Sequence, residues 1–117
     1  MSSKEMKAFT SEKFDTVRVL LESGKSLEAM VYMFNILASL VEDKYDVKKG
    51  SSITIKEYFT ELVKKATVPP ENVHPFVMLM EEALYSHHDL PTDLFKVYKE
   101  RWASLYKDIT GDIAPGL

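Results

Sequence analysis

The chain has 117 residues, of which 45% are hydrophobic and 28% charged, a balance typical of one globular domain rather than of a disordered segment. Its formal net charge of -3 excludes the basic character expected of a nucleic-acid-binding domain. The absence of cysteine excludes disulfides and thiolate metal sites, and Met1 to Lys7 lacks the apolar run of a signal peptide. We therefore expect one soluble, cytoplasmic domain over residues 1–117, with short flexible ends at about residues 1–4 and 112–117.

The stretch between Ala29 and Val41 is apolar on nearly every side, because only Asn35 and Ser39 in it are polar. The polar residues of the wider segment follow one another at helical spacing and form one narrow stripe: Glu28, Asn35, Ser39, Glu42 and Asp46. A helix with so narrow a polar face is surrounded by other elements. Membrane spans need roughly 20 consecutive apolar residues, and this run is shorter. We therefore predict a buried central helix over about residues 26–47 and no direct membrane insertion.

The helix before this one, and both ends of the central helix, are also marked in the sequence. Apolar residues recur at helical spacing from Met6 to Leu21, and Ser23-Gly24 follows as a stop signal. A second start signal at Thr10-Ser11 predicts an interruption of this first helix. The hydroxyl of Ser26 is the predicted N-cap of the central helix, and Lys48-Lys49-Gly50 marks its predicted end.

The third predicted helix has the clearest start. Thr54 and Glu57 have the spacing of a capping box, and Ile53 and Tyr58 occupy the positions of a hydrophobic staple. Val68-Pro69-Pro70 ends this helix, because proline lacks a backbone N–H and restricts the residue before it.

Two further helices complete the predicted fold. Pro75 suits the first turn of the fourth helix, and Thr92 or Asp93 caps the fifth, which ends at Thr110-Gly111. No segment has the alternation that indicates a strand. We therefore predict an all-α, single-domain bundle of about five helices around the central one.

Two neighbouring histidines indicate a possible metal site. His87 and His88 follow Glu81 and precede Asp89, so a site built from histidine and glutamate is one hypothesis. Adjacent histidines on a helix point in different directions, however, and a histidine near a helix C-terminus is favourable for the helix dipole alone. We therefore assign no metal and keep His87, His88 and Glu81 as the candidates for one.

Methionine and aromatic residues are the signal for a binding surface. Methionine lines adaptable grooves but also fills irregular cores, and four methionines lie in dense apolar runs: Met30, Met33, Met78 and Met80. Tyr98, Trp102 and Tyr106 recur every four residues beside Arg101, a composition typical of interaction hot spots. Core packing is the alternative for both groups. The partner-binding candidates are Tyr98, Arg101, Trp102, Tyr106 and Met78.

No complete catalytic or cofactor-binding motif is present. Gly24-Lys25-Ser26 is similar to the end of a phosphate-binding loop, but Val19 stands where that loop requires glycine. The paired acids Glu42-Asp43 and Glu81-Glu82 do not share a helical face. We therefore predict no enzymatic activity and no cofactor.

Three short motifs together resemble a known family. They are a turn and apolar helix start at Gly24 to Ala29, a capped Glu-Tyr start at Thr54 to Tyr58, and an acidic helix with an aromatic residue at Leu79 to Tyr85. In this order, Leu20 to Trp102 resembles the cytosolic helical domain of unknown function at the C-terminus of many prokaryotic membrane proteins, which often carry a transglutaminase-like domain as well. The resemblance implies no catalytic residues, and a place in the cytoplasm or in the cytosolic part of a membrane-associated system.

A second helical family is an alternative. Small domains of toxin and nucleotidyltransferase systems share the Gly-x-x-x-x-Ala helix start found at Gly24 to Ala29. Their ribonuclease members carry an arginine followed four to six residues later by histidine, whereas here Arg18 is followed by Ser23-Gly24 and Arg101 by Tyr106-Lys107. The nuclease signature is therefore absent.

Our leading hypothesis is a non-catalytic helical module that binds another protein, or itself, through an apolar surface of methionine and aromatic residues. The alternatives are a nucleic-acid-associated domain of the toxin type and a metal protein that uses histidine and glutamate. Since the net charge argues against nucleic acid, we expect a protein partner or a homo-oligomer.

Overall fold

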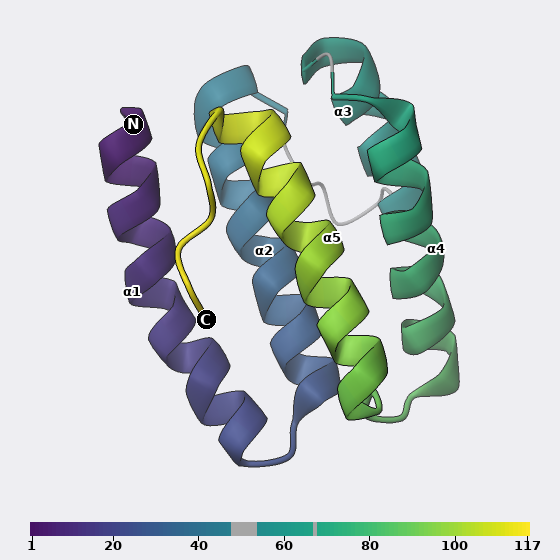
Figure 1. Ribbon diagram of the computed structural model, residues 1–117. Coiled ribbons are helices and arrows are strands. Elements are labelled where there is room, and N and C mark those ends of the chain that lie inside the picture. Colours follow the sequence, from purple (N-terminus) through teal and green to yellow (C-terminus); the bar gives the residue numbers. More distant parts are fainter. Residues whose placement is uncertain (48–53, 67) are drawn as a thin grey trace.

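The fold is built from α-helices. The computed structural model describes residues 1–47, 54–66 and 68–117, and within these ranges it contains no strand. The helices shown in Figure 1 are, in chain order, α1 (Ser3–Glu22), α2 (Ser26–Tyr45), α3 (Ile55–Ala66), α4 (Pro70–Ser86) and α5 (Thr92–Thr110). The predicted all-α, single-domain bundle is therefore confirmed.

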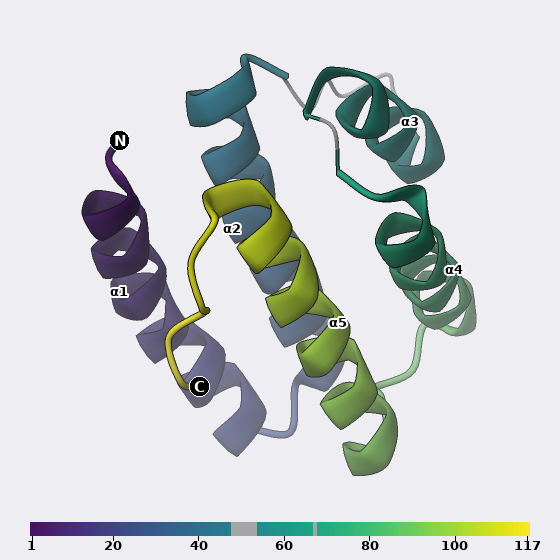
Figure 2. The same cartoon turned by 45° about the horizontal axis from the view of Figure 1, so that its top comes forward.

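Helix α2 lies in the middle of the bundle and contacts all four other helices. Helix α1 packs on one side of α2 and α5 on the other, while α4 packs against α5 and α3 against α4 (Figures 1 and 2). Helices α2 and α5 run in the same direction, whereas α1 and α4 run opposite to them (Figure 1). Two parallel helices therefore form the centre, and antiparallel helices flank them.

Burial along α2 follows the predicted pattern. Nine of its residues are buried. The predicted polar stripe is exposed at every position: Glu28, Asn35, Ser39, Glu42 and, directly after the helix, Asp46. The prediction of a central helix with one narrow polar face is therefore confirmed. Of the helices in the described part of the chain, none is long and apolar enough to cross a bilayer.

Helix α1 differs from the prediction in two respects. It is uninterrupted at Thr10, whose buried hydroxyl donates to the carbonyl of Met6 at 2.8 Å instead of starting a new helix. It also begins at Ser3, because Ser2 and Glu5 form a capping box in which each side chain accepts a hydrogen bond from the other residue's backbone N–H. The flexible end predicted at about residues 1–4 therefore does not include Ser3 and Lys4, which belong to α1.

The segment after α5 lies against the bundle. Residues 112–117, predicted as a flexible tail, run back between α1 and α5 (Figures 1 and 2). Ala114 and Leu117 are partly buried against the core, and the Arg18 guanidinium donates to the carbonyl of Gly116 at 3.0 Å. The tail therefore covers the space that α1 and α5 leave between them.

The start of α2 is capped from a distant part of the chain. Ser26 was the predicted N-cap, but it is the first residue inside the helix and its hydroxyl pairs with the backbone of Leu90. It accepts from the Leu90 N–H at 2.7 Å and donates to the Leu90 carbonyl at 3.1 Å. The Asp89 carboxylate accepts from the N–H of Leu27 at 3.0 Å. The prediction of a local cap is therefore wrong, because the connector between α4 and α5 supplies the acceptor.

The other end of α2 is tied to the end of α5. Helix α2 stops at Tyr45, and Asp46 follows in the left-handed conformation with φ 57°. The predicted end at Lys48-Lys49-Gly50 lies outside the described residues. The Lys44 ammonium donates to the carbonyl of Ile109 at 2.6 Å, and the Tyr45 hydroxyl donates to the same oxygen at 3.3 Å. This satisfies a carbonyl in the last turn of α5 and places a cation where the helix dipole favours it.

The start of α3 and the end of α5 agree with the prediction. The Thr54 hydroxyl accepts from the N–H of Glu57 at 3.1 Å and donates to the Glu57 carboxylate at 3.2 Å, so Thr54 caps α3. Tyr58 of the predicted staple is buried, and its partner Ile53 lies outside the described residues. Gly111 ends α5 in the left-handed conformation with φ 78°, as its sequence position predicts.

The starts of α4 and α5 differ from the prediction. Helix α4 begins at Pro70, because a proline in the first turn loses no helical hydrogen bond, and Pro75 lies inside the helix instead of starting it. Helix α5 follows Pro91, which has no side chain able to cap it, so neither Thr92 nor Asp93 is the N-cap. Helix α4 therefore starts five residues before Pro75, and the N-cap of α5 lies one residue before Thr92.

Substitution of Asp89 tests the cap that the α4–α5 connector places on α2. Asp89→Ala removes the acceptor for the Leu27 N–H, and we expect the free energy of unfolding to fall by about 1 kcal/mol, the usual cost of losing an N-cap. Asp89→Asn keeps an oxygen acceptor, so we expect its free energy of unfolding to fall by less than that of Asp89→Ala. Urea unfolding followed by circular dichroism measures both, with Glu82→Ala as the control for loss of an exposed carboxylate. Equal stability of Asp89→Ala and wild type would contradict a stabilising cap.

Candidate interaction surface

Three of the predicted partner-binding residues belong to the core. Tyr98, Trp102 and Tyr106 are 0%, 1% and 0% exposed, so the prediction that they form a surface is wrong. The Tyr98 hydroxyl donates to the carbonyl of Met30 at 2.8 Å, and the Trp102 indole N–H donates to the carbonyl of Met33 at 2.8 Å. The polar ends of these two rings are therefore satisfied by the backbone of α2, which allows complete burial.

The methionines divide in the same way. Met30, Met33 and Met80 are buried, as the core alternative predicts, whereas Met78 is 56% exposed. Arg101 is exposed on α5, but the aromatic neighbours that made it a hot-spot candidate face inward. Of the five candidates, Met78 alone remains as an exposed apolar residue.

Two buried phenols lack a hydrogen-bond partner among the described residues: Tyr58 and Tyr106. The Tyr106 hydroxyl lies near those of Thr10 and Thr110, which donate to backbone carbonyls and whose oxygens lower the pKa of Tyr106 against the larger effect of burial. Burial raises the pKa of Tyr106, and it raises the pKa of Tyr98 well above the ordinary value of a phenol. The pKa of Tyr58 is raised by burial and, to a smaller extent, by the negative charge of Glu42.

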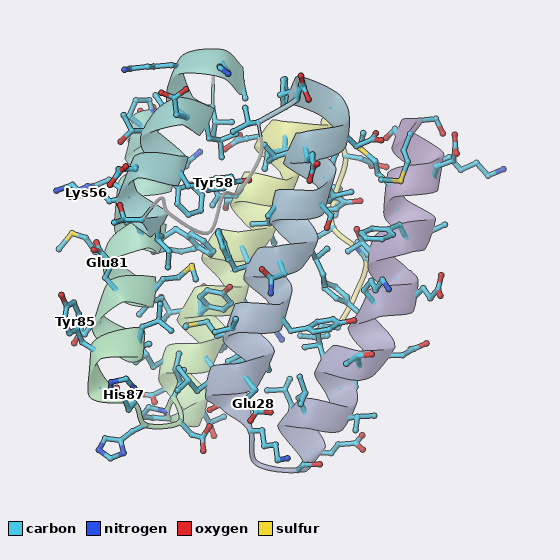
Figure 3. All side chains as sticks on the ribbon, turned by 180° about the vertical axis from the view of Figure 1, so that it is seen from behind. Glu28, Lys56, Tyr58, Glu81, Tyr85 and His87 are labelled. Atoms are coloured by element: carbon cyan, nitrogen blue, oxygen red, sulfur yellow. The ribbon has the colours of Figure 1, made fainter. Side chains whose placement is uncertain are left out.

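The predicted metal candidates do not come together. Glu81 and His87 both lie on the outer side of α4 but are separated along it, and Glu81 is half-buried beside α3 (Figure 3). His87 ends the helix in the left-handed conformation with φ 55°, and His88 follows in the connector. Within residues 1–47, 54–66 and 68–117, no group of three or more histidine, aspartate or glutamate side chains could hold a metal ion.

A groove of about 540 Å³ lies between α3 and α4. Its floor and walls are mostly apolar, with Phe59 and Val63 from α3 and Val73, Val77 and Met78 from α4. Its polar lining residues are Lys56, Thr60 and Lys64 from α3 and His74 and Glu81 from α4. Lys56 and Glu81 lie on the face of the molecule that points away from α1 (Figure 3).

One face of α4 borders this groove and continues beyond it to Tyr85. His74, Met78, Glu81 and Tyr85 follow one another at steps of four, three and four, so they share one helical face. Met78 is 56% exposed and Tyr85 is 85% exposed, and Figure 3 shows Tyr85 directed away from the bundle. Sequence reasoning missed Tyr85, although its four-three-four spacing from Met78 and His74 was available as a signal.

A second hollow, of about 490 Å³, lies where α1, α2 and α4 meet. Its apolar residues are all half-buried: Leu20, Leu27, Val31, Tyr32 and Leu84. Glu28, at the start of α2, lies at its edge (Figure 3). The hollow carries no strongly exposed apolar side chain comparable to Met78, so the groove between α3 and α4 is the stronger candidate for binding.

No protein-family model, curated protein or solved structure matches this chain.

The hydrogen bond from Tyr98 to α2 has a matched control in the same helix. We expect Tyr98→Phe to lower the free energy of unfolding by about 1 kcal/mol, because a buried hydrogen bond is lost. Tyr106→Phe removes a buried hydroxyl that has no partner among the described residues, so we expect it to leave stability unchanged or raise it. Urea unfolding of both variants measures the difference. A loss in Tyr106→Phe equal to that in Tyr98→Phe would contradict the assignment.

The raised tyrosine pKa values predict a loss of stability in alkali. Above pH about 10 the unfolded chain loses its phenol protons, whereas the folded chain keeps those of Tyr58 and Tyr98. The folded state then binds more protons, so the free energy of unfolding falls by about 1.4 kcal/mol per pH unit for each such tyrosine until its folded pKa is reached. Urea unfolding across this range tests it. We expect the slope to become shallower in Tyr98→Phe, which removes one of the buried phenols.

Proposed function

We propose that this chain is a non-catalytic helical module that binds another protein through the groove between α3 and α4. The observation that carries the proposal is the exposure of Met78 in an apolar groove, on a face of α4 that continues to the exposed Tyr85. Large apolar side chains left in water cost free energy, and a partner that covers them recovers it. Methionine adapts to the shape of what it contacts, and tyrosine is enriched at binding hot spots.

The shape of the groove favours a helix as the bound element. It runs between two packed helices, and a third helix laid along it would place one apolar stripe against Val63, Val77 and Met78. In binding of this kind, apolar side chains spaced three and four residues apart on the partner helix contact the groove.

The charges around the groove favour an acidic partner. Lys56 and Lys64 are exposed on the α3 side, and His74 is exposed on the α4 side, against one half-buried carboxylate, Glu81. A partner helix that carries carboxylates beside its apolar stripe would complement the two lysines and be steered toward them. We therefore propose an amphipathic, acidic helix as the ligand.

The remaining expectations stay part of the same proposal. We assign the module no enzymatic activity, no cofactor and no nucleic acid, and place it in the cytoplasm or in the cytosolic part of a membrane-associated system. The resemblance to the cytosolic domain of prokaryotic membrane proteins stays a prediction. The alternatives that use nucleic acid or a metal have no comparable cluster of side chains to support them in the described part of the chain.

Photo-crosslinking from the groove tests the proposal. A photoreactive amino acid at Met78 is expected to give a discrete crosslinked band in cells that express the chain, because a bound partner covers this position. The control carries the same group at Val97 on α5, which is 41% exposed and lies outside the groove. Mass spectrometry then identifies the attached protein. The same weak ladder from both positions would contradict the proposed function.

A further inference from the structure

The outward face of α1 has the properties expected of the ligand for this groove. Six residues that follow one another at steps of three and four are all exposed: Glu5, Ala8, Glu12, Asp15, Val19 and Glu22. They lie opposite the buried face of the helix, which carries Met6, Thr10, Phe14 and Val17. Val19 is 60% exposed, so the stripe has a large exposed apolar residue between Asp15 and Glu22.

All charged residues of this stripe are acidic. Four of its six residues are acidic and none is basic. Glu5 accepts from the Ser2 N–H at 3.1 Å and Asp15 pairs with Arg18 at 2.7 Å, so these two carboxylates also have roles within α1. Together with Val19, the acids make α1 an amphipathic helix of the kind proposed for the partner.

The groove and the α1 stripe lie on opposite sides of the molecule. Helix α1 forms one edge of the bundle, and α3 with α4 forms the other (Figure 1). Lys56, Glu81 and Tyr85 point away from the bundle at the edge remote from α1 (Figure 3). The groove of one molecule can therefore receive α1 of another without either molecule having to open.

We propose that the occupant of the α3–α4 groove is a second copy of this chain, which inserts the outward stripe of its α1 helix. The inference rests on the proposed function of the groove and names its ligand. Val19 enters the apolar part of the groove beside Met78, while Glu12 and Glu22 face Lys56 and Lys64. Because the two surfaces differ, each molecule in a pair keeps one free groove and one free α1, so association continues head to tail.

A contact of one helix along one groove is small and partly electrostatic. We therefore expect association to be weak, to grow with protein concentration, and to decrease as salt screens the exposed charges. These properties separate it from a large obligate interface, which is mostly apolar and insensitive to salt.

Two charge-reversal variants test the inference. Lys56→Glu with Lys64→Glu alters the groove, and Glu12→Lys with Glu22→Lys alters α1. We expect each variant alone to have an association constant at least about tenfold below that of wild type, measured by sedimentation equilibrium. We expect a 1:1 mixture of the two to recover association, because an intact groove meets an intact α1 and the two reversed surfaces complement each other again.

Lys96→Glu with Lys99→Glu is the matched control. It makes the same change in net charge as the groove variant, at two exposed positions of α5 outside the groove, and it is expected to associate like wild type. Circular dichroism establishes that all variants remain folded. The inference is overturned if wild type stays monomeric at every concentration, if the α1 variant alone associates like wild type, or if the mixture fails to recover association.

The outcome also separates this inference from the proposed function. A monomeric wild type together with a Met78 crosslink to a different protein removes the second copy as occupant and keeps the groove as a binding site. A Met78 crosslink to α1 of the same chain supports both. Recovery of association in the mixture without any crosslink from Met78 supports the charge pairing but removes Val19 and Met78 as its apolar contact, which contradicts the inference as stated.

Discussion

Two hydrogen bonds from side chains of α5 into the backbone of α2 fix the centre of the fold. Tyr98 and Trp102 donate to the carbonyls of Met30 and Met33, so each ring is held at one height along the central helix. Because α2 and α5 run in the same direction, the chain must return to the start of the bundle between them (Figure 1). Helix α4 makes that return, and the groove lies between it and α3.

The same pair of helices is joined at both ends. The connector before α5 caps the first turn of α2 through Asp89, and Lys44 of α2 donates to the last turn of α5. The hydroxyl of Tyr98 and the indole N–H of Trp102, together with both ends of this helix pair, thereby have partners within the molecule. The exposed apolar side chains that argue for binding lie instead on the outer helices, with Val19 on α1 and Met78 on α4.

Local signals in the sequence predict the parts of this fold that depend on neighbours in the chain. The burial of α2 follows from its periodicity, and the Thr54 cap from its spacing to Glu57. Ser26 has the same type of side chain, but its partner Leu90 is 64 positions away, which no local pattern contains. The aromatic stripe of α5 was misassigned to the surface for the same reason: the carbonyls that satisfy Tyr98 belong to another helix.

The link between Ser26 and Leu90 has a consequence for how the protein is made. A ribosome releases α2 well before the residues that complete its first turn and cover its apolar sides. Until α5 has emerged, the nascent α2 lacks both its cap and the rings of Tyr98 and Trp102, so chaperones can bind its exposed apolar surface. We therefore expect the bundle to fold only after α5 has emerged, and a nascent chain that stalls within α4 to remain unfolded.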